Sequence, residues 1–416
     1  MLKMKMVLAL LTGLVVSLPT FAGAAEPWRE PQDTAQAINK PDMYAWRLFV
    51  ALNWPAKDGT READPDAQFG ADGRVVWESW ISQDHVFPST DQMQNGVTPR
   101  AWNTPPEDCR VENLRQLPIQ QLIRLQQGGA SPAVEPGFPG QQRVGNEVRM
   151  NRESRDFIAD PNRPLWHIDG QEAFFASGDR LEFPVASKEI KAQWRRITET
   201  EKPRYHWALC RSVDDSEDQL WGLMALHITT KDLPNWFWAT FEHVDNNTDL
   251  VKQQLGLEGW LTHSFDRFSC PGQPRNCNSA PMSGEAERLL GTSLRGTKWQ
   301  HYRLRGTQVD FVTPEGEPTV LANSVIEQGF QTTSSCITCH ALSTIGPRDQ
   351  GLGGDANRLN FFKEFREDFV MGPVGTPDPG LFAQTRLESS TLPRRTFRQL
   401  DFVWSFMLAK RKPASN

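Results

Sequence analysis

The chain has 416 residues, of which 38% are hydrophobic and 23% are charged, and its formal net charge at pH 7 is -6. This length exceeds that of one average domain, and the composition excludes a disordered chain. No cluster of lysine and arginine stands out along the sequence, so we do not expect nucleic acid as a partner.

The first segment has the pattern of a secretory signal peptide. Lys3 and Lys5 precede an uncharged apolar run at residues 6–18, and the small residues at 22–24 fit a cleavage site. The run is shorter than the roughly 20 residues that a membrane-spanning helix needs, although an uncleaved N-terminal anchor is the alternative. We therefore expect residues 1–24 to be removed, leaving a soluble protein in a bacterial periplasm without a transmembrane segment.

Residues 25–315 are predicted to form an α+β domain. Helical patterns predict helices at 41–52 and 112–127, and another at 189–198 that packs on a sheet. Alternating or strongly apolar runs between turn residues predict that this sheet is antiparallel. Its strands are expected at residues 166–168, 181–185, 205–211, 219–230, 235–244 and 299–311. No motif identifies a chemistry here, since G-x-S-x-G, Walker A and H-E-x-x-H are absent from the sequence.

The pattern returns to helices and loops near residue 316, where we place the second domain boundary. Residues 316–416 are predicted to be all-α, with helices at 320–330, at 360–365 and at 396–410. The expected fold class is therefore α+β: helices and an antiparallel β-sheet in the N-terminal and middle region, followed by a C-terminal all-α domain.

Near the C-terminus, the sequence Cys336-Ile337-Thr338-Cys339-His340 has the C-x-x-C-H spacing used for covalent attachment of a c-type haem. One short loop delivers two thiols to the vinyl groups on one porphyrin edge, and the adjacent imidazole reaches the iron. A thioredoxin-like dithiol would follow a strand, and a structural zinc site would need a second ligand pair nearby; neither pattern is present. We predict one covalently bound haem c, with thioether links to Cys336 and Cys339 and with His340 as the proximal iron ligand.

Residues 320–412 resemble a class I c-type cytochrome domain, through this motif, the Gly346-Pro347 pair downstream and a helix predicted to close the chain. The resemblance implies that the carbonyl of Pro347 accepts a hydrogen bond from Nδ1–H of the proximal imidazole; an ordinary turn residue is the alternative. It also implies a methionine as the second axial ligand, from a loop before the last helix. Met371 is the candidate, ahead of Met407 in that helix.

Two histidines of the middle region are the candidates if no methionine binds the iron. His227 and His243 lie in predicted strands. His243 shares a strand face with Phe237 and Phe241, which is typical of a core histidine; a distal haem ligand or an active-site histidine is the alternative for both. The stretch 221–243 is also similar to a family of large exported bacterial proteins that carry one C-terminal cytochrome c domain, a resemblance that implies this layout and no particular substrate.

The other four cysteines form an even set, as expected in an oxidising compartment. Cys270 and Cys277 bracket a short loop with proline and glycine, so we predict a disulfide bond between them. Cys109 and Cys210 are then the second pair by elimination, although four cysteines permit three connectivities.

These features predict a periplasmic monohaem cytochrome that exchanges electrons with a redox partner protein. The alternative is a haem-dependent oxidoreductase, peroxidase-like or substrate-oxidising, in which the N-terminal domain supplies the substrate site or the distal site. About 290 mature residues lie outside the haem domain, more than a simple carrier needs, and this excess favours the enzyme. A binding module whose haem acts as a redox sensor or tether is a third hypothesis.

Overall fold

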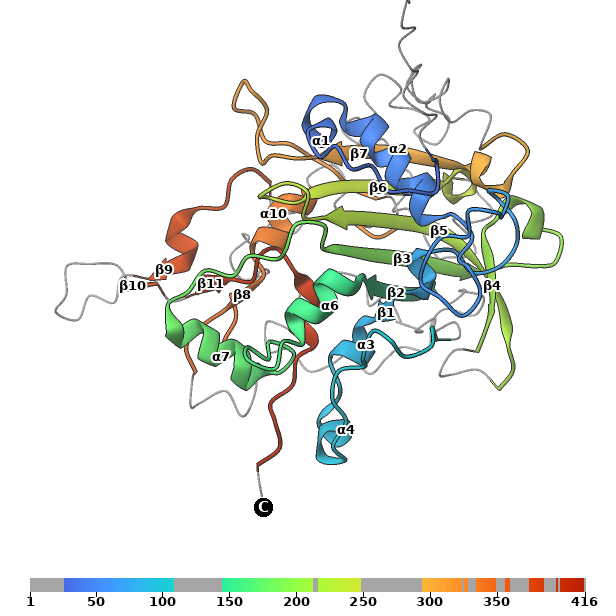
Figure 1. Ribbon diagram of the computed structural model, residues 1–416. Coiled ribbons are helices and arrows are strands. Elements are labelled where there is room, and N and C mark those ends of the chain that lie inside the picture. The colour runs from blue at the N-terminus through green and yellow to red at the C-terminus, as the bar shows by residue number, and fades with distance from the viewer. Residues whose placement is uncertain are drawn as a thin grey trace, which may run out of the picture.

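The computed structural model describes residues 26–107, 144–211, 216–247, 294–323, 325–327, 334–348, 356–359, 374–384, 394–395 and 397–414. Within these residues, seven antiparallel strands form one central sheet (Figure 1). Six of them follow the order β1-β2-β3-β5-β6-β7, and β4 also pairs with β5. The strands are β1 (Ile81–Ser82), β2 (Val144–Met150), β3 (Lys188–Arg196), β4 (Trp207–Cys210), β5 (Gln219–Thr230), β6 (Phe237–His243) and β7 (Tyr302–Gln308).

The central strands β3, β5 and β6 present two different faces, because successive side chains of a strand point to opposite sides of the sheet. In the register of these strands, Ile190 lies opposite Ile228. The next row across the sheet joins Lys191, His227 and Thr240. One face is therefore apolar, whereas the other carries polar side chains.

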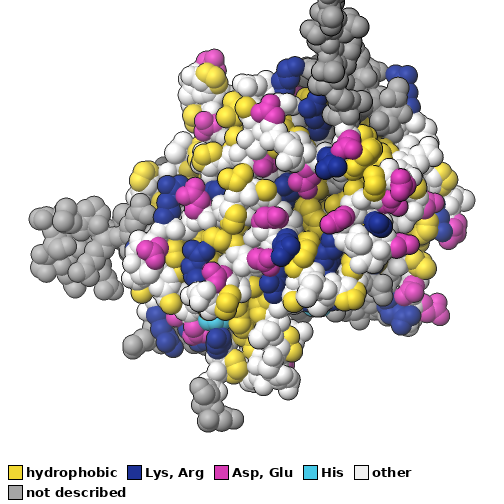
Figure 2. Space-filling view, viewed as in Figure 1, with side chains coloured by type: hydrophobic (Ala, Val, Ile, Leu, Met, Phe, Trp, Pro, Cys, Tyr) yellow, Lys and Arg dark blue, Asp and Glu magenta, His cyan; other side chains and the backbone are white. Residues whose placement is uncertain are grey.

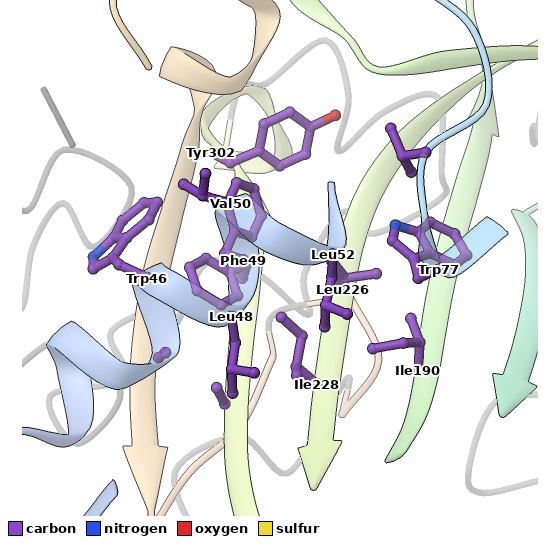
Figure 3. Close-up of a cluster of buried hydrophobic side chains, with 14 of the residues drawn as sticks. Trp46, Leu48, Phe49, Val50, Leu52, Trp77, Ile190, Leu226, Ile228 and Tyr302 are labelled. Carbon is purple, nitrogen blue, oxygen red and sulfur yellow. The ribbon is translucent and has the colours of Figure 1, made fainter. Parts of the chain in front are cut away.

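Helix α2 (Pro41–Leu52) covers the apolar face of the sheet (Figures 1 and 3). Proline is well suited to its first position, where a backbone N–H would have no helical acceptor. Nine of its 12 side chains are buried. The ring centroid of Phe49 lies 4.3 Å from that of Phe241 on β6 and 5.4 Å from that of Trp299. This layer of large rings is the main hydrophobic core.

The C-terminal part of the chain packs on the opposite side of the sheet. One cluster of buried side chains joins Trp238 of β6 and Phe174 to Ile337 and Phe406 near the C-terminus. The sheet and the C-terminal segment therefore share a hydrophobic core. The elements of this segment are α10 (Cys336–Ala341), β8 (Thr344–Ile345), η8 (Pro379–Phe382), β9 (Ala383–Gln384), β10 (Arg394–Arg395), β11 (Arg398–Gln399) and η9 (Trp404–Leu408).

Short helices complete the described part of the chain. Helices α6 and α7 lie below the sheet in the view of Figure 1, on the side of β8 and β11. The α-helices are α1 (Gln36–Asn39), α3 (Gln83–Val86), α4 (Thr90–Gln94), α6 (Arg152–Ile158) and α7 (Ile168–Ser177). The 3-10 helices are η1 (Trp77–Ser79), η2 (Lys202–Arg204), η3 (Val244–Asn247) and η6 (Lys298–His301).

The expected antiparallel sheet is confirmed, and so is the helix expected at 41–52, which is α2. Four of the expected strands correspond to β4, β5, β6 and β7. The helix expected at 189–198 is wrong, because these residues form the central strand β3 between β2 and β5. Residues 166–168 and 181–185 are not strands, and β2 was not predicted. Polar and apolar residues alternate along β3, a period that suits a strand paired on both edges.

The expected all-α C-terminal domain is not found among the described residues. The closing helix expected at 396–410 is wrong: residues 398–399 form strand β11, which pairs with β8, and residues 404–408 form only a short 3-10 helix. This backbone lets Leu400, Val403 and Phe406 enter the shared core. Burial against the sheet therefore decides the conformation of this segment.

The segment that leads into the motif also differs from its expected helix at 320–330. Its described residues contain no helix, and Leu321 instead pairs with Ser335 in a parallel bridge. The helices expected at 112–127 and 360–365 lie outside the described residues, as does the signal peptide. In the part of the chain that the structure describes, no helix is long and apolar enough to cross a membrane.

Candidate haem-attachment site

The motif residues begin a short helix that is tied to the edge of the sheet. Ser335 caps α10, since its hydroxyl accepts a hydrogen bond from the backbone N–H of Thr338 at 3.3 Å. Gln308, at the end of β7, donates to the Ser335 hydroxyl at 2.8 Å. The same side chain accepts from the backbone N–H of Ile337 at 3.0 Å. One glutamine of the sheet thus fixes the start of α10.

The two motif cysteines are free thiols on this helix. Cys336 and Cys339 are three residues apart, a spacing that places both side chains on one side of a helix. Cys336 is buried, and its Sγ lies 3.4 Å from the carbonyl oxygen of Leu321. Burial raises the pKa of both thiols above the ordinary value, so both are protonated at neutral pH.

The imidazole of His340 has a defined tautomer. Its Nδ1 lies 2.8 Å from the carbonyl oxygen of Phe402. A carbonyl can only accept, so Nδ1 carries the hydrogen and Nε2 keeps its lone pair. Burial lowers the pKa of His340 to about 3, which keeps the ring neutral.

This arrangement corrects the role expected for Pro347. The oxygen beside Nδ1 of His340 belongs to Phe402, 62 residues further along the chain. Pro347 itself is exposed just after β8. The physical reason is the pairing of β8 with β11, which brings the chain after β11 back to the motif.

The backbone at Phe402 is strained, and two buried charges hold it. Asp401 and Phe402 have φ values of 47° and 67°, in the left-handed region that residues other than glycine rarely adopt. The carboxylate of Asp401 accepts from the backbone N–H of Phe183 at 2.7 Å and pairs with Lys231 Nζ at 2.7 Å. The sheet side of the molecule therefore orients the carbonyl that meets His340.

Two indoles flank the same imidazole. The ring centroid of Trp238 on β6 lies 4.5 Å from that of His340, and the centroid of Trp404 lies 6.3 Å away, edge-on. Trp404 Nε1 also donates to the carbonyl oxygen of Cys339 at 3.1 Å. The motif histidine therefore lies against the sheet in a largely aromatic environment.

A polar row on the sheet lies beside this aromatic environment. It consists of Lys191, His227 and Thr240, one from each central strand. Asn323 reaches it from the segment before the motif and donates to the Thr240 hydroxyl at 3.0 Å. His227 Nε2 lies 3.7 Å from Glu327 Oε2. Burial, followed by the nearby positive charge of Lys191, lowers the pKa of His227 well below its ordinary value.

His243 is a core histidine, as its pattern indicates. Its Nε2 lies 2.9 Å from the carbonyl oxygen of Arg204, and its Nδ1 accepts from the backbone N–H of Asp245 at 3.1 Å. The ring stacks on Tyr205 with centroids 3.7 Å apart. Both ring nitrogens are occupied, so only His227 of the two candidates lies at the motif with a nitrogen that is not hydrogen-bonded to a described residue.

Of the other predicted residues, only Met407 and Cys210 lie in the part of the chain that the structure describes. Met371 lies outside the described residues, and Met407 lies half-buried in η9. Cys210 ends β4 and is disulfide-bonded, whereas Cys109, Cys270 and Cys277 lie outside the described residues. Both disulfide pairings therefore stay predictions.

No family model matches the chain, and neither does any curated protein or solved structure. Within the described ranges, no group of three or more His, Cys, Asp and Glu side chains could hold a bare metal ion. A haem iron needs fewer protein ligands, because the porphyrin supplies four nitrogens. The two thiols and the oriented imidazole are the protein groups that the C-x-x-C-H spacing predicts for a c-type haem.

Sequence reasoning missed Gln308, Lys231, Asp401 and Phe402, all of which fix the motif. None carries a sequence signal, because each acts through a contact between segments that are distant along the chain.

Proposed function

We propose that this protein is a periplasmic monohaem c-type cytochrome that transfers electrons. The observation that carries the proposal is the C-x-x-C-H motif on one short helix, with both thiols free and with the Nδ1 of His340 already held by a carbonyl. A haem c bound here supplies a one-electron couple at its iron.

The residues around the motif have distinct roles in this proposal. Cys336 and Cys339 hold the porphyrin covalently, and the lone pair of His340 Nε2 binds the iron. The carbonyl of Phe402 increases the basicity of the imidazole, which stabilises ferric iron and lowers the reduction potential. Trp238 contacts the His340 ring and excludes water from that side of the imidazole. A rigid surrounding of this kind favours electron transfer with little rearrangement.

The proposed partner is a periplasmic redox protein. Removal of the signal peptide would take away Lys3 and Lys5 and change the formal net charge from -6 to -8. On the face shown in Figure 2, acidic and basic side chains are interspersed rather than separated into large areas of one sign. The net charge favours a basic partner, and the attraction weakens as salt is added, because screening shortens its range.

A haem-dependent oxidoreductase is the second candidate function. The observation that favours it is His227, a histidine beside the motif whose Nε2 is not hydrogen-bonded to any described residue. An enzyme of this kind would keep the sixth iron position open and use such a histidine as a base. Carbon monoxide separates the two functions, since it binds reduced iron only where that position is open or weakly occupied.

The first prediction tests covalent attachment. Full-length protein exported with c-type haem maturation should be coloured, and acidified acetone should not extract the pigment. The pyridine haemochrome spectrum should indicate two thioether links. Cys336→Ala combined with Cys339→Ala should abolish covalent haem completely, because both links are lost.

The matched control is Thr338→Ser, which lies between the two cysteines and keeps the hydroxyl that bonds Ser335. This variant should retain the covalent haem. A colourless wild-type protein, or a pigment that acidified acetone removes, would falsify the proposed function.

A further inference from the structure

We propose that His227 of β5 is the second axial ligand of the haem iron. This inference rests on the proposed function, because it names the residue that completes the iron coordination begun by His340. It replaces the methionine that the cytochrome resemblance implies with a histidine from the central sheet.

The first step is the position of His227 in the sheet. It lies opposite Thr240 of β6, and Trp238 is two residues away from Thr240 on the same face. His227 and Trp238 are therefore diagonal neighbours, a relation that separates residues by roughly 7–8 Å. Trp238 in turn contacts the ring of His340. The sheet thus brings the His227 side chain to the motif.

The second step is the segment before the motif, which contacts both the polar row and the motif. Asn323 donates to the hydroxyl of Thr240, the residue opposite His227, and the carbonyl oxygen of Leu321 lies 3.4 Å from Sγ of Cys336. Glu327 Oε2, in the same segment, lies 3.7 Å from His227 Nε2. One short segment therefore connects the surroundings of His227 to the first motif cysteine.

The third step is the unoccupied nitrogen of His227. Nε2 is buried and has no hydrogen bond to any described residue. The nearest carboxylate oxygen, Glu327 Oε2, is 3.7 Å away, which is beyond hydrogen-bonding distance. A buried polar atom without a partner is destabilising, and such atoms in folded proteins call for an explanation. Coordination to iron would use this lone pair.

Other buried histidines are each held by at least one hydrogen bond. His167 accepts one from the backbone of Gly170, and His206 pairs with Glu78 at 2.9 Å, although the second ring nitrogen of each also has no hydrogen bond to a described residue. His243 uses both ring nitrogens. The side chain of His227, by contrast, makes no hydrogen bond to any described residue.

The experiment begins with the unmodified protein, so that it does not depend on a variant that folds. Electron paramagnetic resonance and near-infrared magnetic circular dichroism of the ferric protein should show a low-spin iron with two imidazole ligands. The weak far-red absorption band of thioether ligation should be absent.

Variants then assign the second imidazole. His227→Ala should convert the ferric iron from low-spin to high-spin and allow the reduced protein to bind carbon monoxide, and added imidazole should restore the low-spin spectrum. Met371→Ala should leave the spectrum unchanged. The matched control is His301→Ala, which removes a half-buried histidine away from the motif and should also change nothing.

Two results would overturn the assignment. The first is a thioether band in the wild-type protein that disappears in Met371→Ala. The second is a high-spin wild-type iron that binds carbon monoxide, which would instead favour the oxidoreductase. The pyridine haemochrome assay keeps the two proposals distinct: covalent haem with a methionine ligand defeats only this inference, whereas absence of covalent haem defeats the proposed function.

Discussion

The carbonyl of Phe402 and the side chain of Glu189 show how single residues act near the motif. The carbonyl sets the tautomer of His340, and buried charges on Asp401 and Lys231 fix its direction. Glu189 of β3 contacts the same C-terminal segment: one of its carboxylate oxygens accepts a hydrogen bond from the Ser405 hydroxyl at 3.1 Å. Its other oxygen is buried without a partner among the described residues. Such a carboxyl is expected to resist ionisation.

The folding stability should therefore depend on pH through Glu189. Burial raises the pKa of Glu189 from 4.5 to about 7, so between these values the folded protein binds a proton that the unfolded chain releases. Stability should fall as the pH rises through this window, by roughly 3 kcal/mol at most. Glu189→Gln should remove this decline, as measured by urea unfolding at several pH values.

The control for this measurement is Glu199→Gln, which changes an exposed carboxylate with a side-chain exposure of 79%. It should keep the wild-type pH dependence. If Glu189→Gln and the wild-type protein have parallel pH profiles, the carboxyl of Glu189 does not titrate in this window.

At the scale of elements, helix α2 and the sheet face beneath it form the largest aromatic layer in the described residues. Phe49 contacts rings from β6 and η6 and, on β7, the ring of Tyr302 (Figure 3). Phe49→Ala should lower the free energy of unfolding by about 3–5 kcal/mol, because it removes a fully buried ring and leaves a cavity. Urea or guanidinium unfolding followed by tryptophan fluorescence would measure the loss.

Helix α1 offers the matched control. Ile38→Ala truncates a hydrophobic side chain that is 61% exposed, so it should change stability by less than about 0.5 kcal/mol. Similar losses for the two variants would mean that the α2 layer does not determine stability.

The elements differ in how far the sequence predicts them. Strands β5 and β6 and helix α2 have long apolar patterns that suffice. Strand β3 alternates polar and apolar residues, a period of two that indicates a strand rather than the helix expected there, and β2 and β5 pair with it. The closing helix was wrong because the residues after β11 are fixed by the shared core rather than by their own propensity.

In the candidate site, too, the sequence indicates some residues, whereas others depend on contacts between distant segments. Five consecutive residues contain the chemistry of the motif, so sequence alone indicates Cys336, Cys339 and His340. Phe402 is 62 residues from His340 along the chain, and its contact depends on the pairing of β8 with β11. The role of His227 depends on the register of the central sheet, which no local pattern reports.

At the scale of the whole molecule, the shared core connects the C-terminal segment to the sheet. Ile337, Val403 and Phe406 pack in one cluster with Trp236 and Trp238. A fragment of residues 316–416 would expose this apolar surface to water. We therefore predict that the fragment alone does not unfold cooperatively in urea and aggregates at concentrations where the mature chain is stable.

Circular dichroism and sedimentation of the fragment would check this prediction, with residues 25–416 as the control. A cooperative transition in the isolated fragment would contradict it and would support an autonomous domain beginning near residue 316.

The corner at Phe402 also limits how this sequence can diverge. Its φ of 67° suits glycine, but glycine would lose the ring that lies 6.2 Å from Phe311 and 6.3 Å from Trp238. A β-branched side chain would retain apolar contact but would resist the left-handed backbone. Few amino acids satisfy both demands, so related chains that keep this corner should tolerate far less variation there than in their surface loops.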